Sequence, residues 1–161
     1  MEDAALTALS DPMDAFDLVG ASVAEDAVMT QGHTIYLPFA IGDEDDSEWG
    51  LWGQILAAVH AHQHVVQSDR GGFGYSFDYF TDLAARARYE TEAARAELEV
   101  QIWRFGNVSD VSSWTDALLH LGCRPADVAV ATKALLLSAV SILHGATLTE
   151  AGRAALALLP R

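Results

Sequence analysis

The sequence predicts a single α+β domain over residues 1–161, mainly helical, with a small N-terminal β-hairpin packed on a long helix. A length of 161 residues suits one hydrophobic core, and a composition of 51% hydrophobic and 20% charged residues is that of a globular protein. Two short runs rich in β-branched and aromatic residues flank a glycine turn near residue 32. The chain that follows has apolar residues at three- and four-residue spacing, which indicates amphipathic helices.

Charge excludes several classes of partner. Nine basic and twenty-three acidic residues give a formal net charge of −14, which repels nucleic acid and anionic lipid and attracts basic peptides. The longest apolar stretch, residues 134–143, is too short to span a bilayer. We therefore expect a peptide or protein partner, basic if charge selects it, and neither nucleic acid nor membrane. No feature indicates an oligomeric state.

The first residues, Met1-Glu2-Asp3, are acidic where a signal peptide has a basic segment. We therefore expect a cytoplasmic protein, and delivery by a specialised secretion system stays open. A weak helical pattern is present over residues 1 to about 14. The single cysteine, Cys123, has no partner for an internal disulfide and is expected to be a buried small hydrophobe.

The predicted hairpin pairs residues 28–30 with residues 34–39 around the turn at Gly32. The second run ends beside Pro38, which has no N–H to donate, so it is expected at a sheet edge. A free edge can pair with an extended peptide, although a purely structural strand fits the pattern equally well. The candidate substrate-binding residues on this strand are Thr34, Ile35, Tyr36 and Leu37.

A helix predicted over residues 47–68, with Asp46 or Ser47 as its cap, carries the candidate metal ligands. Residues four apart lie on one face of a helix, so His60 and His64 can bind one ion while His62 points away. This is the helical half of an HExxH zinc site. In that motif a glutamate follows the first histidine and accepts a proton from metal-bound water. Here that position is Ala61.

A second long helix is predicted over residues 76–105, after a glycine-rich connection at residues 69–75 that could form a rim or lid. Glu90 lies on the apolar stripe of this helix, where an ionised carboxylate is costly unless it is paired or binds metal. A third metal ligand explains it, and a buried ion pair with Arg86 is the alternative. An opposite, solvated charged face is predicted from Arg88, Glu92, Arg95 and Glu99.

Three further helices are predicted over residues 111–121, 125–143 and 148–159, separated by Gly122, Pro125 and Gly145. Their apolar residues indicate that they are amphipathic or largely buried. We found in them no pattern typical of a catalytic or binding motif.

The order of these motifs resembles a known family. A strand, then His60, His64, Val65 and Gln67 in an HxxxHVxQ pattern, resembles the small zincin-like domains found with contractile injection systems and related HExxH peptidases. The segment from Tyr89 to Ala93, Tyr-Glu-Thr-Glu-Ala, resembles the second-helix segment of gluzincins, where a glutamate supplies the third zinc ligand. The resemblance covers about residues 28–95.

The resemblance implies a zinc metallopeptidase domain in which His60, His64 and Glu90 bind Zn²⁺ and water takes the fourth position. Tyr75, Tyr79 and Tyr89 are possible transition-state donors, and Tyr89 is our candidate catalytic residue. Ala61 departs from the family pattern and supplies no general base, so this chain should be a very poor peptidase.

Two origins fit Ala61: a natural pseudopeptidase that binds a peptide or protein, or an introduced substitution of a catalytic glutamate. The otherwise complete ligand set favours the second. A metal-binding module without turnover and a metal-free helical interaction protein are the competing classes.

Overall fold

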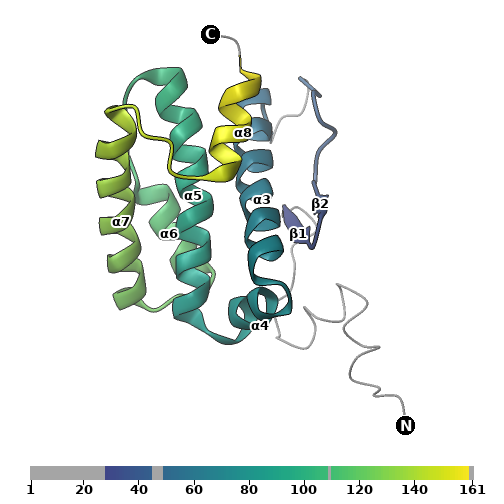
Figure 1. Ribbon diagram of the computed structural model, residues 1–161, viewed down its shortest axis with the longest axis vertical. Coiled ribbons are helices and arrows are strands. Elements are labelled where there is room, and N and C mark those ends of the chain that lie inside the picture. The colour runs from purple at the N-terminus through teal and green to yellow at the C-terminus, as the bar shows by residue number, and fades with distance from the viewer. Residues whose placement is uncertain (1–27, 45–48, 109, 160–161) are drawn as a thin grey trace.

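The computed structural model describes residues 28–44, 49–108 and 110–159 (Figure 1). The described part of the chain is mainly helical, with one two-stranded sheet, which confirms the predicted α+β class. The elements in order are β1 (Met29–Gln31), β2 (Thr34–Tyr36), α3 (Leu51–Gly71), α4 (Phe73–Thr81), α5 (Leu83–Phe105), α6 (Ser112–His120), α7 (Pro125–Leu143) and α8 (Glu150–Leu158). The helix expected near residues 1–14 lies outside the described residues.

The hairpin forms as predicted, with a shorter second strand. β1 pairs antiparallel with β2, so that Thr30 faces Ile35, and the turn uses a positive φ of 54° at Gly32. The pairing ends at Tyr36, before Pro38, and the chain then turns so that Phe39 packs on Trp49 with 5.0 Å between ring centroids. The hairpin lies against the outer side of α3 (Figure 1).

The first long helix begins later and ends later than predicted. α3 begins after Gly50, which provides no side-chain cap, and residues 45–48, where we expected the cap, lie outside the described residues. The glycine-rich stretch predicted to be a flexible connection is mostly helical. Only Gly72, at a φ of 54°, separates α3 from α4, because glycine adopts this left-handed conformation at little cost.

The second predicted helix is two helices. The backbone of Asp82 is extended, and its side chain accepts a hydrogen bond from the N–H of Ala84 at 2.8 Å. Asp82 thereby ends α4 and caps α5, since an aspartate can satisfy one of the free N–H groups at a helix start. The apolar periodicity continues across this break, which is why the sequence pattern alone joined the two helices.

The most enclosed of the described helices is α5. Helix α5 lies between α3 and α7 and also contacts α4, α6 and α8 (Figure 1). Its buried residues therefore lie on several sides, and Leu98 and Val100 are fully enclosed. In contrast, Leu51, Ile55 and His62 leave one side of α3 exposed. The close pairing of α3 with α5 is what brings the candidate site together.

The three C-terminal helices are confirmed within one or two residues at each end, and Cys123 is buried as expected. Helix α7 is long and apolar enough to cross a membrane by length and composition, and 28% of its most apolar stretch is buried inside the fold. A single such helix is weak evidence for a membrane span. One side of α7, which includes Leu135 and Ile142, packs along α5.

Candidate metal centre

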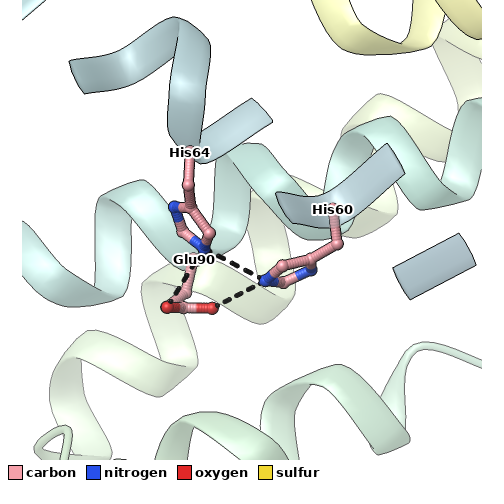
Figure 2. Close-up of side chains that lie close together, drawn as sticks. All are labelled: His60, His64 and Glu90. Carbon is pink, nitrogen blue, oxygen red and sulfur yellow. Dashed lines mark hydrogen bonds and ion pairs between the residues drawn. The ribbon is translucent and has the colours of Figure 1, made fainter. Parts of the chain in front are cut away.

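The two histidines of the HxxxH pattern lie one turn apart on α3 and point toward α5 (Figure 2). The Nε2 atoms of His60 and His64 are 3.1 Å apart, and the two rings meet edge to face. His62 lies on the exposed side of the helix, as helical geometry predicts. The two imidazoles can therefore bind one ion between α3 and α5.

Glu90 completes the group from α5 (Figure 2). Its Oε2 lies 3.2 Å from His60 Nε2, and its Oε1 lies 3.4 Å from His64 Nε2. The ligand atoms of the three residues lie within 4.8 Å of one another, and the Glu90 side chain is only 10% exposed. This group could hold a metal ion.

The spacing of the two histidine nitrogens agrees with a tetrahedral ion. Bonds of about 2.0–2.1 Å at tetrahedral angles place neighbouring ligand atoms roughly 3.3 Å apart. The Nε2 atoms of His60 and His64 are 3.1 Å apart, and Glu90 approaches them with different oxygens, Oε2 at 3.2 Å from His60 and Oε1 at 3.4 Å from His64. Two imidazole nitrogens and a carboxylate are also a donor set that zinc accepts in catalytic sites.

The alternative explanation of Glu90, an ion pair with Arg86, is not what the structure shows. The Arg86 guanidinium donates instead to the backbone carbonyls of Tyr79 at 3.0 Å and Leu121 at 2.7 Å. Glu90 accepts a short hydrogen bond from the hydroxyl of Tyr79 in addition to its contacts with the histidines. Its burial is thus accounted for by the candidate centre.

The second nitrogen of each histidine is also occupied. His60 Nδ1 donates to Glu97 Oε1 on α5 at 2.5 Å. His64 Nδ1 lies 2.8 Å from Gln67 Oε1 and 3.0 Å from the Tyr75 hydroxyl. These partners favour the tautomer with a hydrogen on Nδ1, which leaves Nε2 free to bind a metal.

Sequence analysis did not single out Glu97. It follows Glu90 by seven residues, which is two helical turns, so the two carboxylates lie on nearly the same face of α5. That spacing was a usable signal, because a carboxylate beside a metal-binding histidine commonly orients it.

The protonation states of the group are strongly coupled. Burial by itself lowers the pKa of His60, but hydrogen bonds and attraction from Glu90 and Glu97 raise it to about 10. Burial likewise opposes ionisation of Glu90, yet the charges and hydrogen bonds of His64 and His60 hold its pKa well below its usual range. Without a metal, the group is therefore a buried cluster of imidazolium and carboxylate, and a metal ion has to replace a proton.

The position of the expected general base is fully enclosed. Ala61 has no exposed surface, and its carbonyl oxygen accepts a hydrogen bond of 3.4 Å from the Thr30 hydroxyl on β1. The alanine offers no group that can accept a proton. Strand β1 thus contacts α3 at the residue where the motif would have its glutamate.

Tyr89, the candidate catalytic residue, has a different environment from Tyr75 and Tyr79. Its ring packs on Tyr75 with 4.7 Å between centroids, and its backbone carbonyl accepts from Gln67 at 2.9 Å. Among the described residues, the tyrosine hydroxyls that contact the candidate metal ligands are those of Tyr75, at His64, and Tyr79, at Glu90. Burial, followed by the charge of Glu90, raises the pKa of both, so they stay protonated and can donate.

The four predicted substrate-binding residues lie on or just after the outer strand of the hairpin. Thr34 and Tyr36 are exposed, whereas Ile35 and Leu37 are half-buried. Within the described two-stranded sheet, β2 pairs only with β1, so its other edge has no strand beside it. That edge satisfies the geometric condition for pairing with an extended peptide, which stays a prediction.

A small cavity of about 30 Å³ lies beside the group on the side of α6 and α7. Its walls are mostly apolar, with His60 and Glu90 as the ionisable residues. The lining residues are His60, Glu90, Thr91, Ala94, Trp114, Ala117, Leu118, Leu121 and Leu135. An apolar wall keeps water away from one side of the centre and strengthens the electrostatic interactions there.

Comparison of the chain with protein-family models, with curated proteins and with solved structures found no match. The chemistry of the site has to be inferred from the geometry of its residues.

Proposed function

We propose that this protein is a zinc metallopeptidase-like domain whose His60, His64 and Glu90 bind Zn²⁺ and whose peptidase chemistry is suppressed by Ala61. The observation that carries the proposal is the convergence of His60, His64 and Glu90, which bring one potential ligand atom each to within 4.8 Å of the others. The hydrogen bonds at both Nδ1 atoms support it, because they direct both Nε2 atoms to one point.

A bound zinc ion would supply an acidic water and a Lewis acid for the scissile carbonyl. The residues of this chain would do the rest: His60, His64 and Glu90 would hold the ion, and the hydroxyl of Tyr75 could donate to an oxyanion, whereas that of Tyr79 donates to Glu90. Ala61 has no group that could take the proton from the attacking water. The acidic surface, with a net charge of −14, would favour a basic peptide as substrate or ligand.

Metal content is the first test. Protein purified without an affinity tag should contain about one zinc per chain by elemental analysis. His60→Ala and Glu90→Ala should lose the metal, whereas His62→Ala, which changes an exposed histidine of the same helix, should retain it. A wild-type protein that takes up no zinc, even when it is supplied in excess, would overturn the proposal in favour of a metal-free interaction protein.

Restoring the base is the second test. Ala61→Glu should cleave basic or self-derived peptides, whereas the protein with Ala61 should not. General-base catalysis contributes roughly a hundredfold or more in rate, so the difference should be readily measured. A zinc-loaded Ala61→Glu variant with no turnover would remove the peptidase interpretation.

The second candidate is a pseudopeptidase that binds a peptide or protein without cleaving it. The complete burial of Ala61 favours it, because the larger side chain of a glutamate would need space inside a packed interior. On this interpretation the wild-type protein binds basic peptides and zinc, and Ala61→Glu gains no activity. Peptide binding measured by fluorescence anisotropy, with and without zinc, separates it from a protein that binds metal alone.

A further inference from the structure

The carboxylate of Glu97 lies between the candidate centre and α6. One oxygen accepts from His60 Nδ1 at 2.5 Å, and the other accepts from the indole N–H of Trp114 at 3.1 Å. The Glu97 side chain is 15% exposed, so little water is available to replace either donor. This carboxylate therefore joins three helices at one point: α3 through His60, α5 through Glu97 itself and α6 through Trp114.

The position of Trp114 is in turn fixed by the core. It packs against two clusters of buried residues, one that includes Leu98 and one that includes Leu135, and it also lines the cavity beside His60 and Glu90. A side chain held on several sides gives a hydrogen-bond donor a defined direction. The indole can therefore hold the Glu97 carboxylate in the orientation that His60 needs.

We propose that Glu97 is the positioning residue for His60, held by Trp114, and that this chain of contacts makes α6 part of the metal site. The inference rests on the proposed zinc centre. Hydrogen bonding to a carboxylate fixes the orientation and tautomer of a metal-bound histidine and makes the imidazole a stronger ligand.

The arrangement distinguishes the two histidines. His64 is oriented by neutral groups, Gln67 and Tyr75, whereas His60 is oriented by a charged one. Hydrogen bonds to charged groups are about twice as strong as those between neutral groups. The effect of removing the orienting group should therefore be greater at His60.

Glu97→Gln tests this with little change in shape. His60 and Trp114 meet different oxygens of the carboxylate, so in the amide one of these two donors would face the NH₂ group, which cannot accept its hydrogen. Zinc affinity is measured by competition with a chromophoric chelator, and the visible spectrum of the Co²⁺-substituted protein reports the ligand geometry. We expect a 10- to 100-fold loss of zinc affinity, as is typical for such partners, and an altered Co²⁺ spectrum.

Asp116→Asn is the matched control, because it removes an exposed carboxylate two residues from Trp114 on α6. It should bind zinc as the wild type does. Trp114→Phe is the second variant, which keeps an apolar ring over the cavity and removes the indole donor. It should lose less affinity than Glu97→Gln and keep the wild-type set of ligands.

The outcomes separate the two proposals. If the wild type binds zinc and Glu97→Gln binds it equally tightly with an unchanged Co²⁺ spectrum, the positioning role is wrong and the zinc centre stands. If the wild type binds no zinc, both proposals fail. If Glu97→Gln does not fold, as judged by circular dichroism, an unchanged zinc affinity and spectrum in Trp114→Phe would overturn the role of Trp114 in holding the carboxylate.

Discussion

Helix α5 carries two buried glutamates, Glu90 and Glu99, and they are buried for opposite reasons. Glu90 is 8% exposed and meets two imidazoles, which favour its ionised form. Glu99 is 1% exposed and meets the start of α8. Its Oε1 accepts from the N–H groups of Leu148 and Thr149, and its Oε2 accepts from the Thr149 hydroxyl at 2.7 Å.

The surroundings move the two pKa values in opposite directions. Histidine neighbours outweigh the effect of burial at Glu90 and hold its pKa well below the usual range. Burial dominates at Glu99 and raises its pKa, although its hydrogen bonds and Arg95 act against the increase. A buried carboxylate is therefore a candidate metal ligand only when the groups around it are ligands as well. Glu99 is a helix-docking residue.

The largest expected difference is in metal binding. Glu90→Ala removes a direct ligand and should reduce zinc affinity by more than about 100-fold, the upper limit for an orienting neighbour. Glu99→Gln should leave zinc affinity unchanged. Chelator competition on both variants measures the contrast. Equal losses in the two variants would mean that burial on α5, and not ligation, explains Glu90.

The next effect concerns the docking of α8. A Cβ at Gly152 would overlap Glu99 Oε2, far inside contact distance, so Gly152→Ala must displace the carboxylate or the helix. We expect a loss of about 1–3 kcal/mol, typical of overpacking. Urea denaturation measures it. Gly74→Ala on α4 is the control, because a Cβ there meets no atom within 4 Å and should stabilise slightly. Equal stability of the two variants would contradict the close contact.

A smaller effect is expected at Thr149, whose hydroxyl accepts from Gly152 N–H and donates to Glu99. Thr149→Ala loses this helix cap and should cost about 1 kcal/mol, whereas Thr149→Ser keeps the hydroxyl and most of the stability. Thermal unfolding of both variants provides the comparison. If the serine variant is as unstable as the alanine variant, the methyl group and not the cap is responsible.

The smallest effect is in the pH dependence of stability, measured with a chelator present. The folded-state pKa of Glu99 is raised above 4.5. Its contribution to the free energy of unfolding is therefore complete below pH 4.5 and is lost as pH rises through the raised pKa. The pH dependence at Glu90 has the opposite direction. Its contribution to the free energy of unfolding is present above pH 4.5 and is lost as pH falls through its lowered pKa. Relative to Glu99→Gln, the wild type should therefore lose stability as pH rises above 4.5. No such slope would contradict the assignment.

Sequence periodicity identified Glu90 and failed at Glu99 for the same physical reason. Spacing along a helix shows which residues share a face, but it does not show how many faces are covered. Glu90 was on the apolar stripe and is buried as expected, whereas Glu99 was assigned to a solvated face that α8 covers. The enclosure of α5 by helices distant in sequence could not be predicted from local spacing.

The three candidate metal ligands, which lie on two helices, could be predicted from the sequence. His60 and His64 follow from helical geometry, and Glu90 follows from the cost of burying a charge. The role of Trp114 could not be predicted, because its contact with Glu97 depends on how α6 packs against α5. The break at Asp82 was also missed, because the apolar pattern continues through it.

The docking of α8 on Glu99 also affects the order of events during synthesis. Leu148 and Thr149 follow Glu99 by 49 and 50 residues. At a translation rate of about 5–20 residues per second, Glu99 is made roughly 3 to 10 s before the N–H groups that satisfy it. In that interval α3 and α5 lack the helix that packs across both of them. The three candidate metal ligands are thus synthesised before α8, which packs against the two helices that carry them. Firm metal binding should therefore follow the synthesis and docking of α8.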